Sequence, residues 1–138
     1  MNVKPASGYR EIDHTADWEL EIWAPTLPEL LEQSALGMYH LTGIKPTSGL
    51  HSSHSISLQF DDPETLLVDF LNELLFLIES EDLVINQFDL RIEADTLLAV
   101  LSGVKIDSLD KEIKAATYHQ LAIRETGQGL LASIVFDV

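Results

Sequence analysis

The chain has 138 residues, of which 46% are hydrophobic, and its 23 acidic and 8 basic residues give a formal net charge of −15. This length and apolar content predict one domain, residues 1–138, with a core of its own. The acidic balance argues against direct nucleic-acid binding, because phosphate backbones are bound mainly by lysine and arginine, and the absence of cysteine excludes disulfides, thiolate metal sites and cysteine nucleophiles.

The first eight residues show no periodicity and lack the apolar core of a signal peptide. No stretch of about 18 consecutive apolar residues follows, so no membrane span is expected. We therefore expect a cytoplasmic protein that does not associate with a membrane.

A polar cluster with the sequence Asp-His-Thr-Ala-Asp occupies residues 13–17, between a short strand expected from Tyr9 and an alternating strand that begins at Trp18. Two carboxylates four residues apart with an imidazole between them suit a metal site or an acid/base group. The alternative is a turn whose side chains hydrogen-bond their own backbone. After the cluster, Leu20 and Ile22 alternate with glutamates, which is typical of a half-buried strand.

Two helices are predicted, each from a start signal followed by apolar residues at helical spacing. Thr26 and Glu29 form a capping box with Pro28 in the first turn, and the apolar pattern ends near Gly43. An Asp-Pro-Glu start at Asp62 opens the second helix, whose leucines leave only a narrow polar stripe. We expect this helix to lie across a sheet with its leucines in the core.

Period-two patterns predict the remaining strands, which cover residues 54–60, 83–93, 97–104, 113–124 and 130–138. Residues 105–112 are expected to form an exposed loop, and the glycines at 127 and 129 to allow a tight reversal between the last two strands. Two helices and roughly six to eight strands predict an α+β fold. The expected arrangement is a single domain of mixed sheets in a sandwich, with two helices packed on one side.

A second candidate site lies at the end of the last predicted strand. Asp137 falls on the face opposite the apolar residues, and if the chain ends at Val138, a terminal carboxylate lies one residue away. Two anions so close are costly unless a cation joins them. With Asp17 the site would offer only oxygen ligands, which favour calcium, magnesium or manganese over zinc, and we expect no lysine near enough to neutralise these anions. The alternative is an acidic chain end without a role, since spacing alone does not bring residues 17 and 137 together.

Another polar concentration, Lys-Ala-Ala-Thr-Tyr-His, covers residues 114–119. On a strand, Lys114 and Tyr118 would share one face and His119 would lie on the other. Because apolar positions follow it, His119 is either a core histidine or part of a site, and the sequence leaves both interpretations open.

Four segments together resemble the archease family. They are Asp-His-Thr-Ala-Asp at 13–17, Leu-Val-Asp-Phe-Leu-Asn-Glu-Leu-Leu at 67–75, the Lys-to-His segment at 114–119 and Phe-Asp-Val at 136–138. The resemblance spans nearly the whole chain. It implies a non-enzymatic accessory protein of the RNA-splicing ligase that joins 3′-phosphate or cyclic-phosphate ends to 5′-hydroxyl ends in tRNA splicing. Such a protein promotes guanylylation of the ligase and its multiple turnover.

The same resemblance implies that Asp17, Asp137 and Val138 bind a divalent metal ion, calcium in the first place and magnesium or manganese otherwise. Further residues that fall in family motifs without an assigned role are Asp13, His14, Lys114, Tyr118 and His119. The sequence has no glycine-rich phosphate loop, which suits an activator. Two alternatives stay open: a metal-dependent hydrolase that uses the same acids with His14 or His119, and a chaperone-like binding module.

Overall fold

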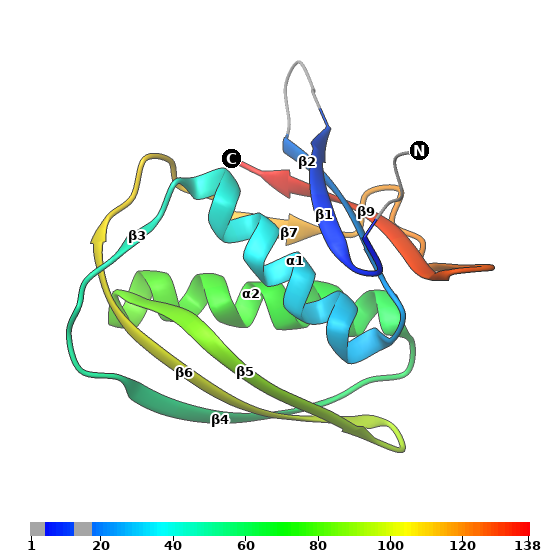
Figure 1. Cartoon of the computed structure of the whole chain (residues 1–138), viewed down its shortest axis with the longest axis horizontal. Coiled ribbons are helices and arrows are strands. Elements are labelled where there is room, and N and C mark those ends of the chain that lie inside the picture. Colours follow the sequence, from blue (N-terminus) through cyan, green and yellow to red (C-terminus); the bar gives the residue numbers. More distant parts are fainter. Residues whose placement is uncertain (1–4, 13–17) are drawn as a thin grey trace.

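The computed structural model describes residues 5–12 and 18–138. The elements in chain order are β1 (Gly8–Ile12), β2 (Trp18–Ala24), α1 (Leu27–Thr42), β3 (Lys45–Pro46), β4 (Ser52–Gln59), α2 (Pro63–Glu81), β5 (Leu83–Glu93), β6 (Thr96–Ser108), β7 (Ala115–Thr117), β8 (Arg124–Thr126) and β9 (Gly129–Asp137). Figure 1 shows both helices lying between two groups of strands.

The strands form two sheets. The first sheet has the order β1-β2-β9-β7, with β8 also paired to β9, and in the second sheet β6 lies between β4 and β5 and also pairs with β3. Every pairing in the described residues is antiparallel, although mixed sheets were expected. The crossover through α2 joins two strands, β4 and β5, that run parallel to each other. They do not pair with each other because β6 lies between them and runs antiparallel to both.

Both helices begin at the residues that the sequence predicts, and α1 also ends there. The hydroxyl of Thr26 accepts a hydrogen bond from the Glu29 N–H at 3.4 Å, and Gly43 ends α1 in the left-handed region with φ of 64°. The carboxylate of Asp62 accepts a hydrogen bond from the Thr65 N–H at 2.7 Å. This hydrogen bond is the main cause that lowers the pKa of Asp62, and it stabilises the first turn of α2.

The core lies in the layer of helices between the sheets. Helix α1 contacts β1, β2 and β5, while α2 contacts β4, β5 and β7, so the helices cover one face of each sheet. Inward-facing Leu20 and Ile22 are fully buried, as are Phe70 and Leu71 of α2. The α+β fold with two helices is therefore confirmed.

The α1 helix packs unusually close to β2. A Cβ atom at Gly37 would lie 2.5 Å from a methyl carbon of Leu20 and 2.9 Å from the Tyr9 ring. A glycine at this position lets the helix backbone approach the first sheet, which brings β1 and β2 against α1.

The expected strand over residues 113–124 is wrong. It is divided into β7 and β8, and because β2 pairs along one edge of β9, these two short strands share the other edge. Between them the chain turns: the Leu121 N–H donates to the Tyr118 carbonyl at 3.0 Å, and Gln120 has φ of 53°. The expected loop over 105–112 is also shorter, because β6 extends to Ser108.

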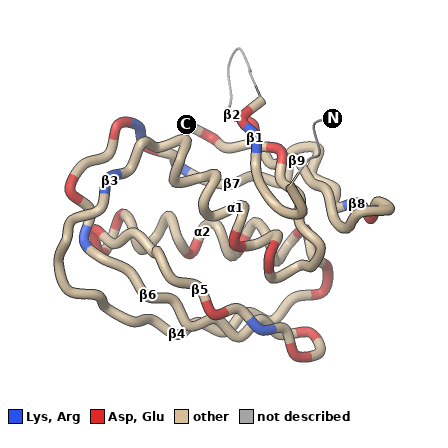
Figure 2. The backbone as a smooth tube through the Cα atoms, viewed as in Figure 1, with Lys and Arg blue, Asp and Glu red and all other residues tan. Residues whose placement is uncertain are grey.

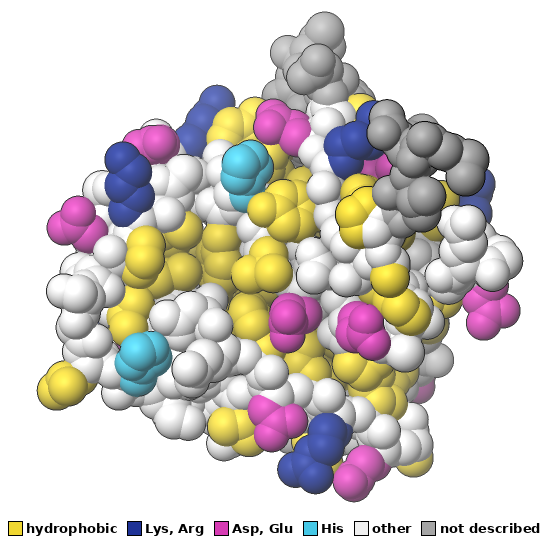
Figure 3. Space-filling model, in the orientation of Figure 1, with side chains coloured by type: hydrophobic (Ala, Val, Ile, Leu, Met, Phe, Trp, Pro, Cys, Tyr) yellow, Lys and Arg dark blue, Asp and Glu magenta, His cyan; other side chains and the backbone are white. Residues whose placement is uncertain are grey.

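Acidic residues are spread over the molecule. Figure 2 shows Asp and Glu on strands, on both helices and on the connecting segments. On the face shown in Figure 3, acidic side chains lie both near the middle and at the edges, between groups of hydrophobic side chains. The negative charge is thus a property of the surface as a whole. In the described part of the chain, neither helix is long and apolar enough to cross a membrane.

Candidate functional site

The candidate site lies where strands of the first sheet begin and end together. Trp18, the first residue of β2, pairs with Phe136 of β9, and Ala115, the first residue of β7, pairs with Asp137. We call this region, formed by Trp18, Lys114, Ala115, Asp137 and Val138, the strand-end site. Figure 1 shows the chain end marked C beside the start of β2. The expected site residues Asp13, His14 and Asp17 lie outside the described residues.

Asp137 is positioned by the ladder of β9. Its neighbour Phe136 faces inward and is fully buried, so alternation along the strand leaves Asp137 exposed on the opposite side. The backbone carbonyl of Asp137 accepts a hydrogen bond from the Lys114 N–H at 2.8 Å. Val138 is partly buried and packs against the core. The carboxylate of Asp137 is therefore held at a well-anchored strand end and is accessible from solvent.

Two lysines accompany this end of the sheet. Lys114 is hydrogen-bonded through its backbone to Asp137, and the ammonium of Lys111 lies 4.6 Å from the centroid of the Trp18 ring, a cation–π contact. The expectation of no lysine near enough to neutralise the anions stays a prediction, but the Lys114 backbone lies beside Asp137. Spacing did not show this because the turn after β6 returns residues 111–114 to the end of β9.

The strand-end site offers ligand atoms of the type that a hard divalent cation binds. Asp137 offers a carboxylate, and a second carboxylate is available at Val138 if the chain ends there; both are oxygen donors of the type that calcium, magnesium and manganese prefer. Within residues 5–12 and 18–138, no group of three or more His, Asp or Glu residues is arranged to hold a metal ion. The third expected ligand, Asp17, lies outside the described residues.

Asn72 of α2 holds β7 in place. Its side-chain oxygen accepts a hydrogen bond from the Ala116 N–H at 2.9 Å, and its side-chain nitrogen donates to the Ala116 carbonyl at 3.5 Å. A side-chain amide can satisfy both backbone groups in this way because it carries a donor and an acceptor. Asn72 belongs to the narrow polar stripe predicted for this helix, and the signal for its role is an amide in the middle of a leucine-rich helix.

Tyr118 lies next to α2 and is 55% exposed. Desolvation raises the pKa of its phenol, and the negative charges of Asp69 and Asp62 raise this pKa further. The tyrosine hydroxyl thus remains a neutral donor at ordinary pH. Its neighbours are the α2 acids, so the structure associates Tyr118 with the helix layer.

His119 is exposed, so the interpretation as a core histidine is wrong. Its N–H donates to the Thr117 hydroxyl at 3.3 Å, at the turn that interrupts the expected strand. The residue lines a polar cavity of about 350 Å³ together with Glu19 and Glu21 of β2. His119 and Lys114 therefore belong to different surroundings, although the sequence places them in one motif.

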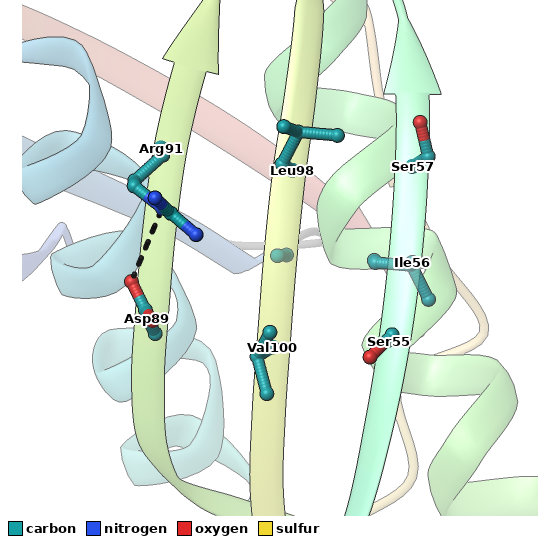
Figure 4. Close-up of a pocket in the computed structure, with 8 residues that line it drawn as sticks. Ser55, Ile56, Ser57, Asp89, Arg91, Leu98 and Val100 are labelled. Carbon is teal, nitrogen blue, oxygen red and sulfur yellow. Dashed lines mark ion pairs between the residues drawn. The ribbon is translucent and has the colours of Figure 1, made fainter.

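The outer face of the second sheet carries a shallower cavity of about 230 Å³, drawn in Figure 4. Residues labelled there are Ser55, Ile56, Ser57, Asp89, Arg91, Leu98 and Val100. The Arg91 and Asp89 side chains form an exposed ion pair at 4.0 Å, and such pairs stabilise little. This face includes none of the expected site residues.

Comparison with known proteins gives a consistent result. Residues 9–138 match the model of the Archease protein family. Protein archease of Methanosarcina barkeri is 36% identical over 94% of this chain and 95% of its own length. A crystal structure of an archease from Thermotoga maritima, described as a possible chaperone, has a TM-score of 0.71 at 27% identity and covers 100% of this chain and 98% of that one. Protein 1598 of Methanobacterium thermoautotrophicum shares the fold, with a TM-score of 0.73 at 23% identity over 95% of this chain and 99% of that one.

Proposed function

The chain belongs to the archease family, and from this premise we propose that it is an accessory protein that activates an RNA-splicing ligase in tRNA processing. It promotes guanylylation of the ligase and multiple turnover, and it is not itself an enzyme. The observation that carries the proposal is the strand-end site, where Lys114 and Asp137, from two separate family-like motifs, are joined by a backbone hydrogen bond.

Charge supports a protein partner of this kind. The chain has a formal net charge of −15, and a ligase that binds RNA needs a basic surface for the phosphate backbone. Opposite charges accelerate association and orient the partners. The same negative charge repels free RNA and GTP, which suits a protein that acts on a ligase and not on these substrates alone.

We propose that Asp17, Asp137 and a carboxylate at Val138 hold one divalent cation, with calcium as the first candidate. A bound cation of this kind neutralises phosphate charge and orients the attacking group. The part played by the chain itself is to hold the Asp137 carboxylate exposed at the end of a strand whose next residue inward is fully buried. Lys114, whose backbone is hydrogen-bonded to that of Asp137, is a basic residue of the same site, which suits a site that meets phosphate groups.

The proposed action is in trans. The strand-end site docks at the mouth of the ligase active site, and its carboxylates arrange metal ligands there so that GTP reaches a geometry competent for guanylylation. Acids at the rim of this site, such as Glu19 and Glu21, mainly affect the rate of association and its salt dependence. Asp17 and Asp137 affect the activated step itself.

The test of activation uses a purified RNA-splicing ligase of the proposed class. Guanylylation and RNA joining are followed under multiple-turnover conditions, with and without the chain. We expect the ligase to stop after early turnovers when alone and to continue when the chain is added, while the chain alone neither hydrolyses GTP nor joins RNA. Rates of guanylylation and RNA joining that do not change when the chain is added would contradict the proposal, as would GTP turnover by the chain alone.

The test of the cation uses calorimetry with calcium and manganese. We expect Asp137→Asn and Asp17→Asn to lose binding, and a chain extended beyond Val138 to bind less tightly, since each change removes or displaces a proposed oxygen ligand. The control is Glu93→Gln, which removes the same charge from an exposed residue of β5. Equal binding by all variants would show that these residues hold no cation.

A chaperone-like function is the second candidate, because the Thermotoga maritima archease is described as a possible chaperone. This function requires the isolated chain to suppress aggregation of unrelated unfolded proteins. Light scattering by a thermally unfolding client, with an equally acidic unrelated protein as control, separates the two candidates. Protection of clients without any effect on the ligase would favour the chaperone.

A further inference from the structure

A groove runs beside the C-terminal half of α2, bounded on its other side by β6 and the segment that leads into β7. Its cavity volume is about 590 Å³. Two of its apolar side chains are unusually accessible, since Phe76 is 60% exposed and Leu109 is 37% exposed. The other apolar residues of the lining are Leu75, Ile78, Ile106, Ile113 and Ala115. We call this feature the α2 groove.

The charges around the α2 groove are mainly negative. Glu79 and Asp82 lie on the helix side and Glu112 on the opposite side, while Lys114 is the one basic residue among those that line it. An apolar floor with an acidic rim is complementary to an apolar side chain flanked by lysine or arginine.

The wall of the groove is fixed in place by backbone hydrogen bonds. The N–H groups of Asp110 and Lys111 both donate to the carbonyl of Thr42, at 3.0 and 3.1 Å, and the N–H of Lys114 donates to the carbonyl of Asp137. A preformed groove loses little conformational entropy when a partner binds. Because Ala115 lines the groove and also pairs with Asp137, the groove is continuous with the strand-end site.

We infer that the α2 groove docks a segment of the partner ligase that carries an apolar anchor flanked by Lys or Arg. The inference rests on the proposed function, because the ligase is the partner proposed above. The inference assigns different roles to two neighbouring surfaces. The groove supplies affinity through Phe76, as buried aromatic anchors do in protein interfaces, and the strand-end site supplies the activated step.

The first test measures the dissociation constant between the ligase and the fluorescently labelled full chain. Phe76→Gln is expected to raise this constant about tenfold, the loss typical of an aromatic anchor. The matched control is Leu50→Gln, an equally polar change at a side chain that is 96% exposed and lies outside the groove. Circular dichroism and thermal melts confirm that both variants are folded.

The second test addresses the acidic rim. Glu79→Lys, on the groove, is expected to raise the dissociation constant about threefold at low salt and less at high salt, because exposed charges are screened. Glu93→Lys makes the same change in net charge on an exposed residue of β5 outside the groove. Equal effects of the two lysine variants would mean that only overall charge matters, which overturns the role of the rim.

Activity then separates this inference from the proposed function. With Phe76→Gln, ligase stimulation should return at saturating concentrations of the chain, whereas with Asp137→Asn it should stay reduced by about tenfold or more at every concentration. If the parent chain stimulates the ligase and Phe76→Gln binds within twofold of Leu50→Gln, the groove is not the docking surface although the proposed function stands. If the parent chain neither binds nor stimulates the ligase, the proposed function fails and the docking inference fails with it.

Discussion

The two sheets enclose the same pair of helices but differ in the continuity of their ladders. In the second sheet, β4 pairs with β6 without interruption from Ser52 to Gln59, and β5 pairs along the other edge of β6 with one irregularity near Asn86. The two-residue β3 pairs with the last residues of β6 across a register shift. In the first sheet, one edge of β9 is shared by β7 and β8, which have three residues each. The described family-like motif residues outside α2 lie on or next to the first sheet.

This difference leaves the candidate site on the sheet with the less continuous edge. A continuous ladder uses its backbone groups within the sheet, and its outer face carries serines together with an exposed ion pair, Asp89 and Arg91. An interrupted edge places Lys114, Tyr118 and His119 in three different environments within six residues. Connecting segments held on a rigid scaffold are where binding residues concentrate, and the first sheet provides this arrangement.

The largest expected effect tests the helix layer that both sheets share. Leu71 is fully buried in α2, so Leu71→Ala should lower the free energy of unfolding by about 2–5 kcal/mol through lost burial and a residual cavity. Val100→Ala, on the outer face of the second sheet where Val100 is 43% exposed, should change it by less than about 0.5 kcal/mol. Urea unfolding measures both. Similar losses in the free energy of unfolding for the two variants would contradict a core shared by both sheets.

The next largest effect on the free energy of unfolding is expected in the second sheet. A Cβ atom at Gly103 would lie 2.2 Å from the Val84 carbonyl oxygen, whereas at Gly127, in the β8–β9 turn, it would meet nothing within 4 Å. Gly103→Ala should therefore cost about 1–3 kcal/mol of overpacking, and Gly127→Ala should leave the free energy of unfolding within about 0.5 kcal/mol of the parent. Urea unfolding tests the pair, and an unchanged stability for Gly103→Ala would mean that the β5–β6 ladder can move apart.

A smaller effect is expected at the interrupted edge. Asn72→Ala removes the two hydrogen bonds to Ala116, which should cost about 0.5–1.5 kcal/mol. Hydrogen exchange should accelerate at the amide of Ala116 and stay unchanged at Leu101 in the second sheet. Equal acceleration at both amides would show that Asn72 supports the whole fold and not β7 in particular.

The smallest effect is a pH dependence at Tyr118. Its pKa is raised, first by desolvation and then by Asp69 and Asp62, so the stability associated with the neutral phenol is retained below pH about 10 and lost as pH rises through the folded-state pKa. An ultraviolet titration compared with Tyr118→Phe isolates this group. Asp69→Asn should lower the pKa of Tyr118 part of the way to its ordinary value, and an unchanged titration would place Asp69 too far away to act.

Local signals in the sequence were sufficient for the helices. Thr26 and Asp62 cap α1 and α2 as predicted, because a cap is decided by hydrogen bonds within a few residues. The alternation around Leu20 also predicted its buried face. The strand predicted over residues 113–124 was wrong because its pairing depends on β9, which offers that edge only at its two ends.

The candidate site was less predictable for the same reason. Strand alternation predicted the exposed position of Asp137, but the approach of Lys114 depends on a turn that returns to the end of β9. The amide of Asn72 reaches Ala116, 44 residues away in sequence, and no local pattern encodes a contact of this range. The metal site of Asp17, Asp137 and Val138 stays a prediction.

The most direct measurement of the central claim compares charge-matched variants of the two sheets in ligase guanylylation under multiple turnover. Asp137→Asn removes a carboxylate from the strand-end site, and Glu93→Gln removes one from the second sheet at the end of β5. We expect both variants to bind the ligase, Glu93→Gln to stimulate it as the parent does, and Asp137→Asn to lose stimulation by about tenfold or more, as expected when a group that stabilises developing charge is removed. Full stimulation by Asp137→Asn at normal ligase binding would show that the Asp137 carboxylate is not required for stimulation of the ligase.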